Sequence, residues 1–352
     1  MKPYRIAQVG SIWERTPPPL YGGTERIVST LTEGLVKSGH KVTLFATGDS
    51  VTQAHLSSVY PSPLFRDGIP WTDLMYPLLH LSQVFDRAHE FDIIHVHLNK
   101  SSDYISLPLA RKVQSNVVFT MHFPYPLSQK RQGRHLVLQK YSDLNYISIS
   151  DSQRKGGENL NWLKTIYNGI NMKPYTFHKQ PGSYLVWLGK FNPDKGVKEA
   201  IDVSKRSGMK LLLAGKIDSL EKEDYQYYQE VVKPQIDGKS VEYIGEVGDY
   251  EKNDLLGNAY AFLNPIKWNE PFGLVMIEAM ATGTPVISFS EGAAPEIITK
   301  NTGFLVKDIE EMASRVDEVH TIDREKCRKH IEKRFSSDVM VKNYEHIYTQ
   351  LA

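Results

Sequence analysis

The sequence has only one cysteine, Cys327, so the chain cannot form an internal disulfide bond. A single thiol also excludes zinc sites built from paired cysteines, and it is typical of proteins in a reducing compartment. No segment approaches the roughly 18 consecutive apolar residues of a membrane-spanning helix, and the apolar run within residues 1–10 is too short for a signal peptide. We therefore expect a cytoplasmic protein that at most makes peripheral contact with the inner face of a membrane.

The chain also lacks an excess of either charge, since 42 basic and 41 acidic residues leave a net charge of +1. This balance gives no reason to expect nucleic acid as a partner. With 41% hydrophobic and 24% charged residues, the composition excludes collagen-like and largely disordered chains. The length of 352 residues instead predicts about two globular domains.

Short β-rich runs alternate with helical patterns in the first half of the chain. The expected strands are residues 6–9, 41–46, 91–96, 116–120, 146–150 and 165–167, and the first expected helix is residues 24–37. Runs this short are typical of buried parallel strands. The pattern predicts an α/β domain with a doubly wound parallel sheet.

A polar stretch with two prolines and a glycine, residues 171–183, interrupts this alternation and predicts a linker. Further strands are expected at residues 184–188, 210–214, 241–244, 261–264 and 285–289. We therefore predict a domain of residues 1–172, joined by a carboxyl-terminal helix over 336–352, and a second domain of residues 173–335. Two such Rossmann-like domains would face a cleft at the carboxyl ends of their strands, where open α/β sheets bind ligands.

A helix start is encoded around Pro271, because proline suits the first turn of a helix, while Gly283 suits the carboxyl-terminal cap. We expect this helix to begin near Phe272 or Gly273. The first N–H groups of a helix have no partner inside it and lie at the positive end of its dipole, where they bind anions such as phosphate. The N–H groups concerned belong to Gly273, Leu274 and Val275.

Two carboxylates accompany this helix start. Glu270 precedes the helix, and Glu278 lies more than one turn inside it. The two groups need not share one acid–base step, and they can hold different parts of one ligand. The alternative is that Glu270 caps the helix and that Glu278 is a solvated surface residue.

The spacing of Glu270 and Glu278 resembles the pair of glutamates, separated by seven residues, that marks retaining glycosyltransferases of the GT-B fold, family 4 in particular. Further similarities lie in Tyr21–Glu25, Asn168–Ile170, Gly189–Lys190, Asp194–Gly196 and Thr302–Val306. The resemblance implies that a sugar is transferred from a nucleotide-diphosphate sugar, a UDP-sugar of glucose type by family habit, to an acceptor hydroxyl. No pattern identifies the acceptor as a sugar, a lipid or a small molecule.

In that family the first glutamate contacts the donor sugar and the second binds the ribose, so the resemblance assigns these roles to Glu270 and Glu278. Two basic residues hold the diphosphate. Lys195 matches one of them, and Lys190 stands where the family usually has arginine, which keeps the charge but loses the bidentate geometry. The alternative for each lysine is a solvated surface charge.

The resemblance extends to the first domain. Gly22 and Gly23 precede the helix over 24–37, where a glycine pair lets the backbone approach a diphosphate or an acceptor. A tight loop after the preceding prolines is the simpler alternative. His122 ends an expected strand and matches a family histidine near the donor sugar, although a lone histidine can also be structural.

The resemblance and the motifs together define a candidate site. The predicted catalytic residues are His122, Lys190, Lys195 and Glu270. The predicted donor-binding residues are Gly22, Gly23, Lys190, Lys195, Glu270, Phe272, Gly273, Leu274, Val275 and Glu278. No metal and no cofactor are expected, because the sequence has no Asp-x-Asp triplet and because lysines and a helix dipole can replace a cation. By resemblance, the acceptor hydroxyl attacks from the face that the diphosphate leaves, and a phosphate oxygen takes its proton.

Two other polar groups receive no part in the donor site. We expect His95 and His97 to face opposite sides of their strand, which would prevent them from binding one metal ion. A basic run follows His122 and consists of Lys130, Arg131, Arg134, His135 and Lys140. Such a run is either a solvated face or a site for an anionic acceptor or an acidic membrane surface.

Two other functions remain open from the sequence. A non-hydrolysing nucleotide-sugar epimerase shares the two-domain architecture and also releases a nucleoside diphosphate. A non-catalytic nucleotide-sugar-binding protein would keep the fold without turnover. The glutamate pair favours sugar transfer over both.

Overall fold

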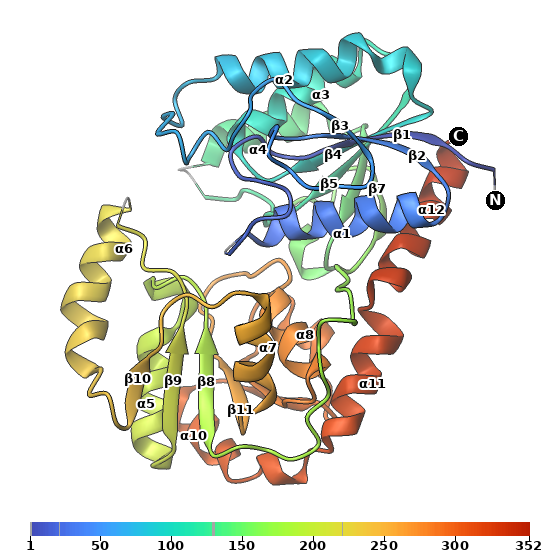
Figure 1. Cartoon of the computed structure of the whole chain (residues 1–352). Coiled ribbons are helices and arrows are strands. Elements are labelled where there is room, and N and C mark those ends of the chain that lie inside the picture. Colours follow the sequence, from blue (N-terminus) through green and yellow to red (C-terminus); the bar gives the residue numbers. More distant parts are fainter. Residues whose placement is uncertain (1, 21, 129–130, 220) are drawn as a thin grey trace. The chain divides into compact units, whose positions relative to one another are not determined.

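The computed structural model describes residues 2–20, 22–128, 131–219 and 221–352 (Figure 1). The chain divides into two compact units, which we call the first unit (Met1–Gly169 with Ser337–Ala352) and the second unit (Ile170–Ser336). The domain limits expected from the sequence, 172 and 335, stay a prediction of where independently folding parts begin and end.

The first unit contains a parallel sheet with the strand order β3-β2-β1-β4-β5-β6-β7 within the described residues. Its strands are β1 (Arg5–Val9), β2 (Lys41–Phe45), β3 (His55–Ser57), β4 (Ile93–Leu98), β5 (Asn116–Met121), β6 (Asn145–Ser148) and β7 (Trp162–Thr165). The sequence did not predict β3, and the strand expected at 165–167 lies earlier, as β7. Both strands are sheet edges, and β7 has no fully buried residue, so neither carries the continuous apolar run of a central strand.

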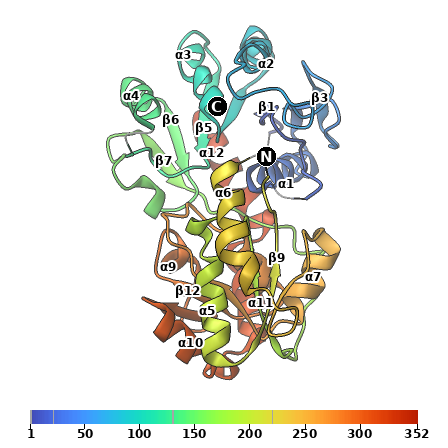
Figure 2. The same cartoon turned by 90° about the vertical axis from the view of Figure 1, so that its left-hand side faces the viewer.

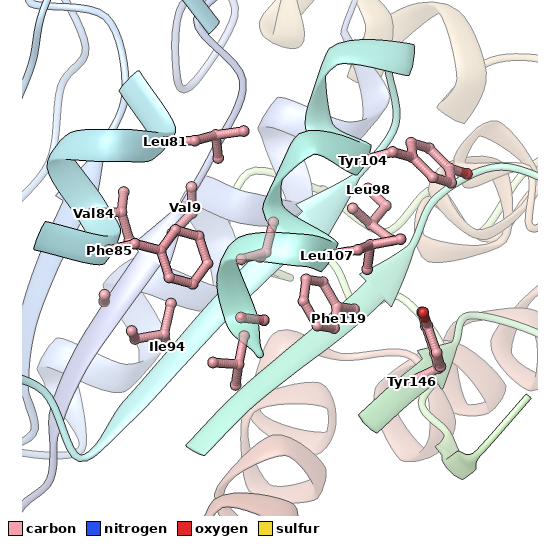
Figure 3. Packing of buried hydrophobic residues seen from close by; sticks show 14 of the residues in the cluster. Val9, Leu81, Val84, Phe85, Ile94, Leu98, Tyr104, Leu107, Phe119 and Tyr146 are labelled. Atoms are coloured by element: carbon pink, nitrogen blue, oxygen red, sulfur yellow. The ribbon is translucent and has the colours of Figure 1, made fainter. Parts of the chain in front are cut away.

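Helices cover both faces of this sheet (Figure 1). They are α1 (Gly23–Lys37), α2 (Met75–Asp86), α3 (Ser106–Ala110), α4 (Gln132–Lys140) and α12 (Ser337–Leu351). One face packs against α2 and α3 through a continuous apolar cluster (Figure 3). In that cluster Val9 and Ile94 point from adjacent strands toward Val84 and Phe85 of α2 (Figure 3). Burying one such side chain contributes about 1.5–3 kcal/mol to folding.

The opposite face of the first sheet is covered by α1 and α12 (Figure 1). The two helices contact each other closely, since a Cβ atom on Gly34 would lie 2.3 Å from Cγ2 of Val341. The buried residues of α12 recur at helical spacing and are Met340, Val341, Tyr344, Ile347 and Tyr348. The carboxyl-terminal helix therefore packs on the sheet formed by the beginning of the chain.

The second unit contains another parallel sheet, with the order β10-β9-β8-β11-β12-β13 within the described residues. Its strands are β8 (Tyr184–Leu188), β9 (Lys210–Ala214), β10 (Val241–Tyr243), β11 (Ala261–Asn264), β12 (Val286–Phe289) and β13 (Gly303–Val306). The edge strand β13 was not predicted from the sequence, because it starts with glycine and exposes Leu305, so that alternation does not separate it from a loop.

Helices complete the second unit. They are α5 (Val197–Ser207), α6 (Lys222–Tyr227), α7 (Asp249–Gly257), α8 (Leu274–Ala281), α9 (Ala294–Ile297), α10 (Ile309–Val316) and α11 (Arg324–Arg334). The helices α5 and α10 lie side by side (Figure 2) and share the apolar core of this unit. The two sheets confirm the predicted fold class, an α/β protein with two Rossmann-like parallel sheets. Among all described helices, none is both long and apolar enough to cross a membrane.

Candidate functional site

Several of the candidate residues follow strands of the second sheet. Lys190 and Lys195 follow β8, and Glu270 follows β11. Gly292, which the sequence did not indicate, follows β12. Because these strands are parallel, their carboxyl ends meet at one edge of the sheet. Residues far apart in the sequence are therefore brought together there.

Glu270 is held by two donors at this edge. Its Oε2 atom accepts hydrogen bonds from Lys195 Nζ at 2.5 Å and from Trp268 Nε1 at 3.0 Å. The Lys195 ammonium also lies 5.1 Å from the centre of the Trp268 ring, within the range of a cation–π contact. The structure thus brings together two residues that the sequence proposed for one site, and it adds Trp268, which no motif indicated.

The backbone places Lys195 opposite Glu270. A short turn, Pro193–Lys195, is capped by the Asn192 side chain, which accepts a hydrogen bond from the Lys195 N–H at 3.0 Å. Gly196 follows in the left-handed region at φ 71°, and a Cβ atom there would lie only 1.9 Å from the carbonyl oxygen of Pro265. Glycine is therefore required for the loop after β8 to approach the end of β11.

The backbone of Glu270 is supported by the turn after β12. Its carbonyl oxygen accepts a hydrogen bond from Ala293 N at 2.9 Å. A Cβ atom on Gly292 would lie 2.3 Å from the same oxygen. The carboxylate therefore projects from a loop that is fixed at both the strand before it and the turn beside it.

Lys190 is paired with two carboxylates rather than one. Its Nζ atom lies 2.7 Å from Asp224 Oδ2, on α6, and 3.3 Å from Asp218 Oδ2, after β9. Burial lowers the pKa of Lys190, but the hydrogen bonds and charges of Asp224 and Asp218 outweigh it, so the pKa is raised overall. Lys190 is therefore an ammonium at neutral pH, and the two aspartates are partners that sequence spacing could not reveal.

The helix α8 begins at Leu274, next to the expected start. Gly273 is the cap residue, in the left-handed region at φ 86°, and no side chain caps this end of the helix. Leu274 and Val275 are half-buried. The Phe272 side chain is buried against Phe335, with ring centroids 5.9 Å apart, so this side chain anchors the core. Only the backbone of Phe272 is left to approach a ligand.

Glu278 is buried, which excludes the alternative of a solvated surface residue. Its Oε1 atom accepts hydrogen bonds from Lys252 Nζ at 2.5 Å and from the Tyr175 hydroxyl at 2.9 Å. Lys252 lies on α7 and is itself buried. Sequence reasoning missed Lys252 because its neighbours on α7 are mostly charged and polar, as on a solvated helix.

In the first unit, Gly22 and Gly23 form the start of α1. Gly23 is the first helical residue, and Gly22 is the cap residue, at φ 150°, which as a glycine supplies no side-chain cap. A Cβ atom on Gly22 would lie 2.7 Å from Cγ of Pro18. This crowding is a purely geometric explanation for the glycine at position 22. The first N–H groups of α1 remain a proposed anion site.

His122 directly follows β5, where its backbone N–H donates to the carbonyl oxygen of Leu98 at 2.9 Å. The ring is buried, and Nε2 lies 2.9 Å from Nδ1 of His97. Burial lowers the pKa of His122 to about 3, so the imidazole is neutral at physiological pH.

The expectation that His95 and His97 face opposite sides of their strand is wrong. Their ring centroids are 4.2 Å apart, and both rings hydrogen-bond the side chain of Gln8. Residues two positions apart in a strand share one face, because side chains alternate with a period of two. Within the described ranges, no group of three or more histidine, cysteine, aspartate or glutamate side chains is arranged to hold a metal ion.

The basic run after His122 is partly engaged with aromatic rings. Lys130 lies outside the described residues. Arg131 and Arg134 lie 3.9 and 5.6 Å from the centre of the Phe123 ring, and Arg134 also donates to Ser101 Oγ at 3.0 Å. Lys140 lies 5.8 Å from the ring of Tyr141. These contacts hold the two guanidinium groups near the residue that follows His122.

Two family models match consecutive parts of the chain. The model described as Glycosyltransferase Family 4 matches residues 21–173, and the model described as Glycosyl transferases group 1 matches residues 172–335. Together they extend over both units.

Known proteins show the same likeness over nearly the full length. An uncharacterized glycosyltransferase of Methanocaldococcus jannaschii is 25% identical over 333 residues, which cover 84% of this chain and 82% of the relative. A sucrose-phosphate synthase structure from Thermosynechococcus elongatus covers 99% of this chain and 98% of its own, with a TM-score of 0.80 and 20% identity.

The structure of HepE from Anabaena in complex with UDP and glucose covers 99% of this chain and all of its own, with a TM-score of 0.74 and 17% identity. At such identities the two structures show a shared fold. Taken with the two family models, the paired sheets and the glutamates before and within α8, they establish that the chain belongs to glycosyltransferase family 4 and is a glycosyltransferase of the GT-B fold.

Proposed function

We propose that the enzyme transfers a glucose-type sugar from a UDP-sugar to an acceptor hydroxyl, with retention of configuration and without a metal ion. The observation that carries the proposal is the contact of Lys195 with Glu270 in the loops beside the uncapped start of α8. It combines a cation, a carboxylate and the first N–H groups of a helix, which are the groups needed for a diphosphate and for sugar hydroxyls. The UDP and glucose in the HepE complex support this choice of donor.

Each carboxylate has a distinct proposed role. Glu278, held by Lys252 and Tyr175, accepts hydrogen bonds from the ribose hydroxyls. Glu270, held by Lys195 and Trp268, accepts them from hydroxyls of the donor sugar. Because each carboxylate is already fixed by two donors, it is oriented before the ligand arrives, which lowers the entropy cost of binding.

The diphosphate is proposed to lie among Lys190, Lys195 and the first N–H groups of α8. Breaking the bond between the anomeric carbon and the phosphate oxygen leaves negative charge on the departing diphosphate, which these groups stabilise. Both lysines are paired with carboxylates in the free protein. A bound diphosphate would therefore share each ammonium with a carboxylate already in place.

The proposed transfer proceeds on one face of the sugar. The acceptor oxygen forms a bond to the anomeric carbon as the bond to the diphosphate oxygen breaks, and the acceptor proton passes to a phosphate oxygen. No side-chain nucleophile is required. The neutral His122 ring contributes a hydrogen bond to the sugar rather than a charge. The acceptor is a sugar, a lipid or a small molecule, and the proposed location is the cytoplasm, with any membrane contact peripheral.

The test is an assay of the purified enzyme with UDP-glucose and a panel of acceptor alcohols. The proposal predicts an α-linked product from the α-linked donor by NMR, at full rate in a chelator. A β-linked product contradicts retention, and a strict requirement for manganese contradicts the phosphate site. Incubation with donor alone separates the alternatives, because isomerisation of the sugar without an acceptor would identify an epimerase, and binding without any turnover a non-catalytic protein.

A further inference from the structure

The first sheet carries a polar stripe on the face that α12 covers. Its members are Gln8 on β1, His95 and His97 on β4, Thr120 on β5, His122 after β5, and Tyr344 and Tyr348 on α12. Each is buried, with at most 7% of its surface exposed. A buried polar atom without a hydrogen-bond partner costs about 1–3 kcal/mol, so the pairing of these atoms is strongly constrained.

The outer part of the stripe connects His122 to the middle of the sheet. His122 Nε2 lies 2.9 Å from His97 Nδ1, and His97 Nε2 lies 2.9 Å from Gln8 Oε1. His97 therefore uses both ring nitrogens, one toward His122 and the other toward Gln8.

The inner part connects Gln8 to the carboxyl-terminal helix. Gln8 Nε2 donates to the Tyr348 hydroxyl at 3.1 Å, and this hydroxyl lies 2.7 Å from His95 Nδ1. His95 Nε2 lies 2.7 Å from Thr120 Oγ1, which lies 3.0 Å from the Tyr344 hydroxyl. Gln8 Nε2 also lies 3.4 Å from His95 Nδ1, so the last helix and β4 together orient the Gln8 amide, although Gln8 and Tyr348 are 340 residues apart.

The orientation of the Gln8 amide sets the protons along the outer part. Its NH₂ group donates to Tyr348, so its oxygen faces His97 and accepts from an Nε2–H group. A neutral imidazole carries one proton, so His97 Nδ1 is bare and accepts from Nε2–H of His122. Burial keeps the rings neutral, since it lowers the pKa of both His95 and His122 to about 3.

We propose that Gln8, His97 and Tyr348 are positioning residues that hold His122 as the neutral Nε2–H tautomer. Nδ1 of His122 is then a hydrogen-bond acceptor for a hydroxyl of the donor sugar. The hydrogen bond from the sugar hydroxyl to His122 rests on the proposed function, whereas the assignment of the His122 tautomer does not. The two parts therefore need separate measurements.

The tautomer is measured on the full chain labelled with [15N]histidine, since NMR distinguishes protonated from bare ring nitrogens. The His122 signals are assigned by their loss in His122→Gln. We expect Nε2 to be protonated and Nδ1 bare from about pH 5 to about pH 8, across the range where an ordinary histidine titrates. A protonated Nδ1, or an imidazolium within that range, would overturn the proposal.

A matched pair of variants separates positioning from stability. Tyr348→Phe and Tyr146→Phe each remove one buried hydroxyl from the first unit, but that of Tyr146 donates to the backbone oxygen of Tyr141, outside the stripe. We expect both variants to lower the melting temperature similarly. Only Tyr348→Phe should give a mixture of His122 tautomers, because Gln8 Nε2 loses its shorter contact and keeps only the 3.4 Å contact with His95 Nδ1. An unchanged tautomer in Tyr348→Phe, or the same mixture in Tyr146→Phe, would contradict the positioning role.

The sugar contact is tested by kinetics of the same two variants. We expect Tyr348→Phe to reduce kcat/KM for the sugar donor about threefold to tenfold, while leaving the affinity for UDP alone unchanged, since a neutral hydrogen bond has about this effect. Tyr146→Phe should leave both values unchanged. Equal kinetics in the two variants, alongside a shifted tautomer in Tyr348→Phe, would refute the sugar contact alone. A wild-type enzyme without transfer activity would instead refute the proposed function and leave the tautomer measurement valid.

Discussion

The candidate polar groups of the two units differ in charge: those of the second unit are ionised and paired, whereas the buried histidines of the polar stripe in the first unit are neutral. In the second unit, Lys190, Lys195 and Glu278 each lie within 2.7 Å of an oppositely charged partner. In the first unit, His122 joins a chain of uncharged groups, and burial prevents the imidazoles from gaining a proton. The candidate groups of the second unit thus form ion pairs, whereas His122 joins neutral hydrogen bonds, although Arg131 and Arg134 lie beside the next residue, Phe123.

The difference has a physical cause in where the side chains lie. Lys190 and Lys195 of the second unit sit in the segment that follows β8, where each keeps about a fifth of its side-chain surface exposed. The buried carboxylate of Glu278, on α8, is instead neutralised by Lys252, on α7. The histidines of β4 lie inside the sheet, under α12, where an ion would lose its hydration.

The largest effect should follow from breaking the buried ion pair of the second unit. Lys252→Ala leaves the Glu278 carboxylate without its cation, and we expect a loss of about 3–5 kcal/mol in the free energy of unfolding. The measurement is urea denaturation of the full chain. Lys198→Ala is the control, because Lys198 forms an exposed pair with Asp202 on α5 and should cost less than about 1 kcal/mol. Equal losses in the free energy of unfolding would show that the buried pair of Lys252 and Glu278 stabilises the fold no more than an exposed pair does.

The next effect concerns the leaving group. Lys195→Ala removes the cation beside Glu270, and we expect kcat/KM for the sugar donor to fall about 100-fold, as when one transition-state donor is removed. Affinity for the bare nucleoside should stay the same. Nucleoside and nucleotide weakened to the same degree would contradict a specific role at the diphosphate.

A smaller effect should appear in the first unit as the pH falls. Histidines whose pKa is lowered in the folded state bind protons more readily when unfolded, so stability is complete above the ordinary pKa of about 6.5 and is lost below it. We expect His95 and His122 each to contribute a loss of about 2 kcal/mol between pH 7 and pH 5. Urea denaturation followed by the His95 ring signals measures it. Stability that rises toward pH 5 would contradict the neutral state of this stripe.

The smallest effect should come from changing a carboxylate that is paired with Lys190. Asp224→Asn removes one of the two carboxylates on Lys190, so UDP should bind about threefold more tightly at low salt, since the pair is partly exposed and screened. Calorimetry at low and high salt measures this change. Weaker binding in Asp224→Asn would mean that Asp224 orients Lys190 for the diphosphate instead of competing with it.

Local patterns predicted the features that depend on neighbouring residues. The central strands of both sheets and the start of α8 near Gly273 were visible from apolar runs and from Pro271. The edge strands β3 and β13 were missed because edge positions need no continuous apolar run. The partners of the site were missed for a different reason, since only the packing of separate strands and helices brings Asp218 and Asp224 to Lys190, and Lys252 to Glu278.

In the polar stripe, the sequence contained the spacing that places two histidines on one face of their strand, but the expectation drawn from it was wrong. His95 and His97 are two positions apart, so they lie on one face of β4, and their rings are in contact. This contact could have been predicted from the sequence. Their partners Tyr344 and Tyr348, by contrast, come from the other end of the chain. No local pattern could have paired Tyr348 with Gln8, or Tyr344 with Thr120.

Isothermal calorimetry of the full chain with UDP-glucose tests whether the second unit binds a sugar nucleotide through Lys195 and Glu270. We expect saturable one-to-one binding that is weakened at least tenfold in Lys195→Ala and unchanged in Lys198→Ala. Binding of equal strength in wild type and Lys195→Ala, or no heat with any sugar nucleotide, would contradict binding through Lys195 and Glu270.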